Sequence, residues 1–155
     1  MATSTVHDTF VIERRYPHSR ERLYAVLSEP ELKRRWHADT TMEPELSETD
    51  FRVGGTDRQR YVMRPDSPFP GHVLENEGRF EDIVEGERIV VSTSMTLGGR
   101  RISTALLTFE LCDEGSGSVL SFTHQAVFYE GADGPEMRRG GWETILDALA
   151  RSLAS

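Results

Sequence analysis

The sequence predicts an α+β domain in which a curved antiparallel sheet of about six to seven strands wraps around one long C-terminal helix. Three observations predict this class. Apolar and polar residues alternate along most of the middle of the chain, which is the period of a β-strand. Glycine-rich turns separate the alternating segments. The C-terminal segment then changes to the 3.6-residue period of an α-helix.

The N-terminal part predicts one strand followed by two short helices. Alternation over Thr5–Tyr16 predicts the strand, and Pro17 ends it because proline has no amide for a strand ladder. The segment Ser19–Ser28 predicts a helix with its first serine as the N-cap. The segment Pro30–Trp36 predicts a second helix, because proline suits a first helical turn.

The middle of the chain predicts a series of strands joined by turns. The expected strands are Glu43–Val53, Thr56–Arg64, His72–Val84, Arg88–Leu97, Ser103–Leu111 and Val119–Val127. Gly54-Gly55 is expected to supply the positive-φ positions of a tight hairpin. Gly98-Gly99 and Gly115-Ser116-Gly117 mark later turns, and the proline-rich segment Pro65–Gly71 predicts a loop.

The final segment predicts a helix that continues to the C-terminal serine. Asp133 followed by Glu136 resembles a capping box at its start. The apolar stripe consists of Trp142, Ile145, Leu146, Leu149 and Leu153. Gly140 and Gly141 lie inside this helix, where each costs about 1 kcal/mol relative to alanine. They either permit a close helix–sheet approach, or admit a ligand, or indicate that the helix begins only at Gly141.

Composition excludes several classes of function. The 155 residues are expected to form a single domain over 1–155, and a net charge of −8 argues against a nucleic-acid partner. No leader-like segment or long apolar run is present, so we expect a cytoplasmic protein without membrane insertion. Cys112 is the only cysteine, and no metal-ligand spacing is recognisable, so no metal or other cofactor is expected. Lys33 is the only lysine and is predicted on an exposed helical turn, which makes lysine chemistry unexpected.

The order of elements and four local motifs resemble the helix-grip superfamily of START-related domains and polyketide cyclases (SRPBCC). The chain is most similar to the branch named after the C-terminal domain of the activator of the 90-kDa heat-shock chaperone ATPase. The motifs are Ser19–Tyr24 leading to Glu29–Trp36, Phe51–Gly55, Gly78–Val84 leading to Glu87–Ile89, and Gly140–Trp142 with Leu146. This resemblance covers nearly the whole chain and implies a helix-grip fold. It does not imply one activity, because the superfamily includes lipid and hormone binders, aromatases, cyclases and chaperone regulators.

Strand and helix periods predict which side chains would line a cavity between the sheet and the long helix. The expected ligand-binding residues are Trp36 at the rim, Tyr61, Met63, Phe80, Thr93, Met95, His124, Trp142, Ile145, Leu146 and Leu149. Tyr61, His124 and Trp142 are the most informative, because each carries a polar atom that needs a partner when it is buried. His124 shares a face with Leu120, Phe122 and Ala126, and is open to a structural, a ligand-binding or an acid–base role.

The function expected from these observations is binding of a small hydrophobic or amphipathic molecule, with no catalytic residue assigned. Two alternatives stay open. One is an enzyme of the cyclase or aromatase type that uses His124 or Tyr61 as an acid–base group. The other is a co-regulator of a chaperone ATPase, which the resemblance implies. The sequence also leaves a homodimer open.

Overall fold

The computed structural model describes residues 4–38 and 42–154 and confirms the predicted class. Seven strands form one antiparallel sheet in the order β1-β7-β6-β5-β4-β3-β2. The elements in chain order are β1 (Val6–Tyr16), α1 (Arg20–Ser28), α2 (Pro30–Ala38), β2 (Met42–Thr49), β3 (Thr56–Met63), β4 (Val73–Val84), β5 (Arg88–Leu97), β6 (Arg100–Glu114), β7 (Gly117–Phe128) and α3 (Pro135–Ala154).

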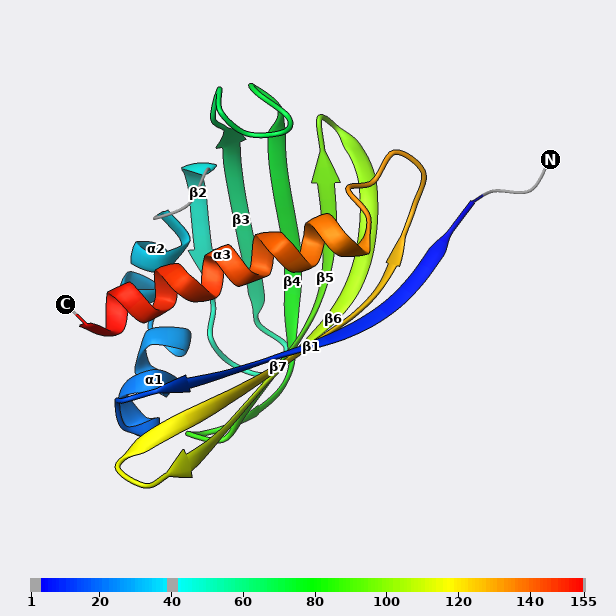
Figure 1. Cartoon of the computed structure of the whole chain (residues 1–155). Coiled ribbons are helices and arrows are strands. Elements are labelled where there is room, and N and C mark those ends of the chain that lie inside the picture. The colour runs from blue at the N-terminus through cyan, green and yellow to red at the C-terminus, as the bar shows by residue number, and fades with distance from the viewer. Residues whose placement is uncertain (1–3, 39–41, 155) are drawn as a thin grey trace.

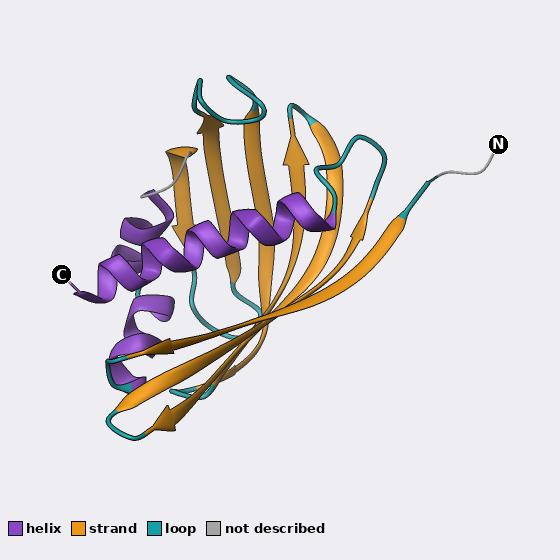
Figure 2. Cartoon of the chain, in the orientation of Figure 1, coloured by secondary structure: helices purple, strands orange, loops and turns teal. Residues whose placement is uncertain are grey.

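The sheet is strongly twisted and presents a concave face to α3. Figure 1 shows α3 crossing this face, with α1 and α2 beside its C-terminal end. The helices all lie on one side of the sheet, while its other side faces away from them (Figure 2). This is the arrangement of an α+β layer fold, in which the helices cover the apolar face of an antiparallel sheet. No helix in residues 4–38 or 42–154 is long and apolar enough to span a membrane.

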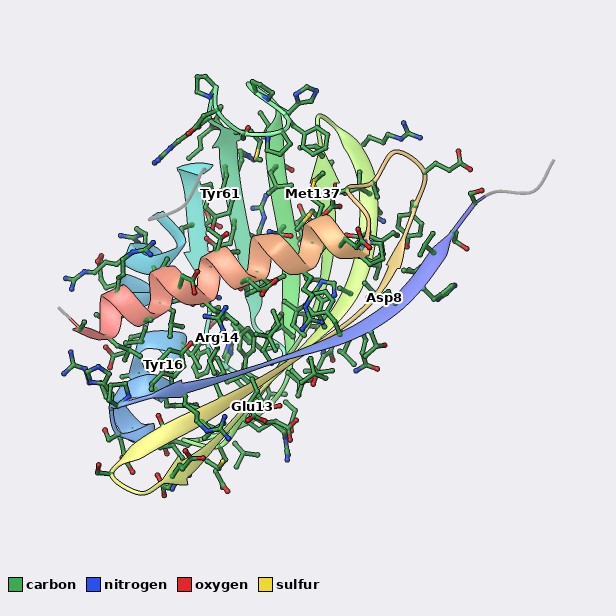
Figure 3. All side chains as sticks on the ribbon, in the orientation of Figure 1. Asp8, Glu13, Arg14, Tyr16, Tyr61 and Met137 are labelled. Atoms are coloured by element: carbon green, nitrogen blue, oxygen red, sulfur yellow. The ribbon has the colours of Figure 1, made fainter. Side chains whose placement is uncertain are left out.

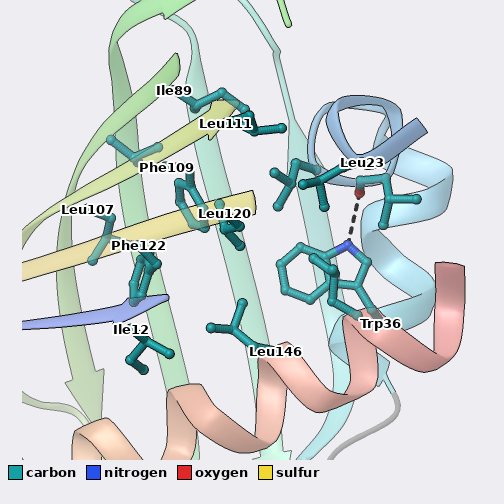
Figure 4. Close-up of a cluster of buried hydrophobic side chains, with 14 of the residues drawn as sticks. Ile12, Leu23, Trp36, Ile89, Leu107, Phe109, Leu111, Leu120, Phe122 and Leu146 are labelled. Atoms are coloured by element: carbon teal, nitrogen blue, oxygen red, sulfur yellow. Dashed lines mark hydrogen bonds between the residues drawn. The ribbon is translucent and has the colours of Figure 1, made fainter. Parts of the chain in front are cut away.

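The predicted helix starts in the N-terminal part are confirmed. Ser19 caps α1, and its Oγ accepts a hydrogen bond from the backbone N–H of Arg22 at 3.2 Å. The prediction that Trp36 lies at the rim of a cavity is wrong, because only 2% of this residue is exposed. Its indole Nε1 donates to the carbonyl oxygen of Val26 at 2.9 Å and so joins α2 to α1 (Figure 4). Trp36 is therefore a residue of the hydrophobic core.

The turn after β2 differs from the predicted hairpin. β2 ends at Thr49, and the following loop pairs with β4 through two hydrogen bonds, from Gly54 N to Phe80 O at 2.8 Å and from Phe80 N to Gly55 O at 3.0 Å. Gly54 has the expected positive φ of 84°. Gly55 is required for a different reason, because a Cβ there would lie 2.0 Å from the carbonyl oxygen of Asp50. This loop therefore fixes the position of Phe80 on the concave face.

The start of α3 agrees with the predicted position, but its cap differs from the prediction. The helix begins at Pro135, so the alternative that it begins only at Gly141 is wrong. The predicted capping box is not formed: the carboxylate of Asp133 accepts two hydrogen bonds from the guanidinium of Arg138, both at 2.7 Å. The physical reason is the burial of Arg138, which is 6% exposed and needs a counter-charge. Gly134 instead accepts the first helical hydrogen bond, from the Arg138 N–H.

The apolar core fills only one part of the space between the sheet and the helices. Figure 4 shows Leu146 of α3 facing Phe122 and Leu120 of β7, with Trp36 beside them. Leu146, Leu149 and Leu153 are completely buried, and all three lie in the C-terminal half of α3. The N-terminal half of α3 contributes none of these completely buried leucines. The core thus leaves the region under the first turns of α3 available for a cavity.

Candidate ligand-binding cavity

Two adjoining cavities lie between the N-terminal half of α3 and the concave face of the sheet. The outer cavity has a volume of about 430 Å³ and the inner one about 80 Å³. Asn76, Met95, Arg138 and Trp142 border both cavities, so the two lie side by side. In Figure 3, Tyr61 lies on β3 and Met137 at the start of α3, and both residues line the outer cavity. The volume of the outer cavity is within the range that small-molecule sites commonly have.

The wall of the outer cavity is mostly apolar. Its apolar members come from four strands, the loop after β3 and α3: Met63, Pro68, Phe69, Leu74, Met95, Leu97, Ile102, Met137, Trp142 and Ile145. Gly140 and Gly141 also border it, and a Cβ added to either would meet no atom within 4 Å. These glycines therefore do not serve a close helix–sheet approach. They leave space in the wall, which favours the alternative that they admit a ligand.

Three buried polar atoms of the cavity walls have no hydrogen-bond partner among the described residues. They are Nδ1 of His124, Oγ of Ser103 and Oδ1 of Asn76. His124 and Ser103 are each 1% exposed, and Asn76 is half-buried. A buried polar atom without a partner costs about 1–3 kcal/mol. Such a concentration in one cavity is unusual for a folded protein and is what a ligand site with unused hydrogen-bonding capacity presents.

The position of His124 follows from the strand register. Phe80, Val91, Leu107 and His124 occupy paired positions across β4, β5, β6 and β7, so His124 points to the concave face as predicted. Its ring stacks on Phe10 of β1 with centroids 4.6 Å apart and an interplanar angle of 7°. Burial, reinforced by the positive charge of Arg138, lowers the pKa of His124 to about 4. The imidazole is therefore neutral at neutral pH.

A second row of paired positions carries the other polar groups. Gln59, Asn76, Met95 and Ser103 are register partners across β3, β4, β5 and β6, and all four border the inner cavity. Gln59 cannot satisfy Asn76, because its own amide is already in use. Its Nε2 donates to Asp57 Oδ1 at 2.8 Å, and its Oε1 accepts from the Tyr61 hydroxyl at 3.2 Å.

A buried ion pair lies at the inner end of the cavity. Lys33 Nζ is 2.6 Å from Asp57 Oδ2, and the side chains are only 12% and 13% exposed. The prediction of an exposed Lys33 is therefore wrong: the side chain turns from α2 to the sheet, and its ammonium lies 5.6 Å from the Phe80 ring centroid. Burial by itself raises the pKa of Asp57, but the charge of Lys33 and the hydrogen bonds outweigh it and hold the pKa below its usual value.

A second ion pair lies at the boundary between the two cavities. Arg138 borders both, makes the paired hydrogen bonds with Asp133, and places its guanidinium 4.9 Å from the ring centroid of Phe128. The two side chains are 6% and 12% exposed. Each charge in the walls of the cavity thus has an opposite charge in contact, and the cavity as a whole carries no net charge from these two pairs.

The predicted site residues fall into four groups. Trp36, Phe80, Thr93 and His124 line the inner cavity, Tyr61, Met63 and Ile145 line the outer one, and Met95 and Trp142 line both. Leu146 and Leu149 line neither, because they pack completely into the core. Sequence reasoning missed Asn76, Ser103, Arg138 and the Lys33–Asp57 pair. A signal existed for two of them, since Asn76 is in phase with Phe80 on β4 and Arg138 precedes Trp142 by one helical turn.

The structure describes the two side chains that the sequence left open as acid–base groups, Tyr61 and His124. The Tyr61 hydroxyl donates to an amide oxygen, and burial, with the charge of Asp57, raises its pKa well above the usual value. His124 makes no hydrogen bond with a carboxylate of the described residues, so no partner orients it as a base. Within the described part of the chain, no cluster of three or more metal-ligating side chains occurs.

Comparisons with known proteins agree with the fold. The family model for Activator of Hsp90 ATPase homolog 1-like proteins matches residues 17–154. The chain is 33% identical to a solved protein of Rhizobium leguminosarum, with a TM-score of 0.90 and coverage of 99% of both chains. It is 36% identical to protein Mll3558 of Rhizobium loti, with a TM-score of 0.82 and coverage of 96% and 99%.

A third structure extends the likeness at the level of fold. Protein CV1439 of Chromobacterium violaceum is 24% identical, with a TM-score of 0.80 and coverage of 95% of this chain and 97% of its own. None of the curated proteins compared with the chain matches it. The family model nevertheless spans all elements except β1. The chain is therefore a member of the Activator of Hsp90 ATPase homolog 1-like family, in the helix-grip superfamily.

Proposed function

We propose that this protein binds a small hydrophobic or amphipathic molecule in the cavity between the sheet and α3. The observation that carries the proposal is the outer cavity of about 430 Å³ with its mainly apolar wall. Cavities of this kind, with a few placed polar groups, are how proteins hold small ligands. The fold family supports the proposal, because helix-grip domains commonly bind hydrophobic ligands.

The packing of α3 supports the same proposal. Its C-terminal half is held by three completely buried leucines, so it does not need apolar contacts at its N-terminal half to stay on the sheet. The N-terminal half contains Gly140 and Gly141, each of which costs about 1 kcal/mol of helix stability relative to alanine. A binding role explains this cost, because larger side chains there would narrow the cavity.

Two measurements test the proposal. Native mass spectrometry of protein purified without denaturation should show a bound small molecule that is lost on unfolding. Fluorescence titration with Nile red, an uncharged apolar dye, should show saturable binding with one site per chain. The absence of both an adduct and saturable dye binding would refute the proposal.

A matched pair of variants locates the binding. Gly141→Leu should weaken Nile red binding at least tenfold, because the new side chain enters the outer cavity. It should not unfold the protein, because leucine favours a helix over glycine by about 0.8 kcal/mol. The control is Ala154→Leu, an exposed position of the same helix that borders neither cavity. Equal affinities of the two variants would place the dye elsewhere and contradict the proposed site.

A further inference from the structure

The polar groups of the cavity define what kind of ligand it accepts. The following inference rests on the proposed function and deepens it. We propose that the ligand is uncharged and carries a hydroxyl group, and that it binds with the hydroxyl end inward and its apolar body in the outer cavity.

The distribution of polar and apolar walls sets the orientation. His124 and Ser103, which carry two of the unpartnered atoms, line the inner cavity, and Asn76, which carries the third, lines both cavities. None of the three belongs to the outer cavity alone. The inner cavity of about 80 Å³ has room for a small group and not for a ring system. An amphipathic molecule therefore places its polar end inward and its larger apolar part outward.

The charges of the walls determine that the polar end is neutral. Both charged pairs are already closed, Lys33 with Asp57 at 2.6 Å and Arg138 with Asp133 at 2.7 Å. An anionic or cationic group would lose its hydration without gaining a free counter-charge, which is costly in a buried site. The third basic side chain of the cavity walls, His124, is buried and neutral at neutral pH.

The chemistry of the three atoms favours a hydroxyl over neutral groups that only accept hydrogen bonds. The Asn76 oxygen is an acceptor and needs a donor, whereas the Ser103 hydroxyl can donate or accept. Nδ1 of His124 donates in one tautomer and accepts in the other. A hydroxyl both donates and accepts, so it can pair with any of these atoms. A group that only accepts, such as an ether or ketone, would leave the Asn76 oxygen without a partner.

Displacement of Nile red by four compounds with the same apolar body tests the inference at neutral pH. The compounds are butylbenzene, 4-butylphenol, 4-butylbenzoate and 4-butylbenzylammonium. We expect 4-butylphenol to bind at least about tenfold more tightly than each of the others, which corresponds to one well-made buried hydrogen bond. An equal affinity of butylbenzene and 4-butylphenol, or tighter binding of either ion, would overturn the inference.

These outcomes are distinguishable from a failure of the proposed function. If Nile red and all four compounds fail to bind, then the cavity is not a ligand site and both proposals fall. If butylbenzene binds as well as the phenol, the binding function stands and only the hydroxyl preference is refuted.

Three variants assign the preference to the inner wall. Ser103→Ala, Asn76→Leu and His124→Phe each remove one unpartnered polar atom, and the last keeps a ring to stack on Phe10. At least one should reduce the advantage of 4-butylphenol over butylbenzene several-fold while the affinity for butylbenzene is unchanged. The Ser103→Ala protein should also melt at a temperature equal to or above that of the unchanged protein, because it loses a buried hydroxyl that has no partner. Retention of the full advantage in all three variants would contradict the inference.

Discussion

The ammonium of Lys33 lies 2.6 Å from the carboxylate of Asp57, and this ion pair connects α2 to β3 at the inner end of the cavity. Thr49 and Gln59 donate two further hydrogen bonds to Asp57 Oδ1, each at 2.8 Å. The only lysine of the chain thus takes part in a closed polar network. This network has consequences for stability that can be measured.

Removing both partners of this pair should destabilise the protein by less than the two single losses added together. Lys33→Met leaves a buried carboxylate without its counter-charge and should lower the free energy of unfolding by about 3 kcal/mol. Asp57→Asn should have a cost of similar size. Denaturant unfolding of the single variants and of the double variant gives the coupling energy, which we expect at about 1–3 kcal/mol. A coupling energy near zero would show that the two side chains do not act as a pair.

The buried His124 should make the protein less stable as the pH falls below neutrality. The pKa of its imidazole is about 4 in the folded chain against 6.5 ordinarily. The unfolded chain therefore binds a proton between these two pH values while the folded chain does not, and stability is lost as the pH falls from 6.5 to 4. The loss is about 3 kcal/mol at 1.36 kcal/mol per pKa unit. Arg138 and Asp133 are the charged groups that act on the ring, and Arg138 reinforces the effect of burial.

Comparison with a His124→Phe variant isolates this contribution. Between pH 7 and pH 4 the free energy of unfolding should fall less for the variant than for the unchanged protein, because the variant has no imidazole to protonate at this position. Asp57 does not confuse the comparison, since its pKa lies below the ordinary carboxyl value and its contribution is lost only at lower pH. An equal fall in the free energy of unfolding of the two proteins over this pH range would contradict the burial of a neutral His124.

Two neighbouring residues of α3 should respond differently to truncation. Leu149 is 0% exposed and borders neither cavity, so Leu149→Ala should lower the free energy of unfolding by about 3 kcal/mol. Ile145 is only half-buried and lines the outer cavity, so Ile145→Ala should cost about 1 kcal/mol. Urea unfolding and Nile red titration would check both. Only Ile145→Ala should change the dye affinity when the two are compared as folded proteins. A changed affinity in Leu149→Ala and an unchanged one in Ile145→Ala would show that Leu149 lines the cavity and that Ile145 belongs to the core.

Removing the counter-charge of Arg138 should change which ligands the cavity accepts. In Asp133→Asn the guanidinium, which borders both cavities, loses both of its charged hydrogen bonds. We expect 4-butylbenzoate to bind at least about tenfold more tightly to this variant than to the unchanged protein, since an anion can now replace the lost charge. Stability should fall by about 3 kcal/mol, because a buried cation is left unpaired.

A matched substitution on α3 serves as the control. Asp147 forms a more exposed ion pair with Arg14, and its side chain is 59% exposed. Asp147→Asn should leave the affinity for 4-butylbenzoate unchanged. If Asp133→Asn shows no gain in affinity for the benzoate, the Arg138 guanidinium is not accessible from the cavity.

Much of the fold could be predicted because it depends on local patterns. Alternation placed His124 on the concave face with Leu120 and Phe122, and the structure confirms it. The predicted cap at Ser19 is also confirmed, because an N-cap needs only a hydroxyl near the next free N–H groups. The predicted capping box at Asp133 does not form, and the reason is a tertiary interaction that local sequence patterns do not include. A buried arginine five residues later competes for the carboxylate, and its burial depends on the strands beneath it.

The candidate site could be predicted less completely. Helical periodicity placed Leu149 and Ile145 in one apolar stripe, although one is core and the other lines a cavity. The periodicity of a helix predicts which face a residue lies on, but it does not predict whether neighbouring elements fill the space next to that face. Lys33 shows the same limit, since its long side chain reaches the carboxylate of a strand distant in the sequence.

The order of strands, turns and helices, the concave face and the membership of the helix-grip superfamily follow from the sequence, because each rests on short-range patterns and their spacing. The cavity and its unpaired polar atoms follow only from the tertiary structure. They depend on how seven strands align in register and on where α3 crosses them. The volume of the cavity beneath α3 is the space between the helix and the sheet minus the volume of the side chains that fill it. No single segment of the chain determines this volume.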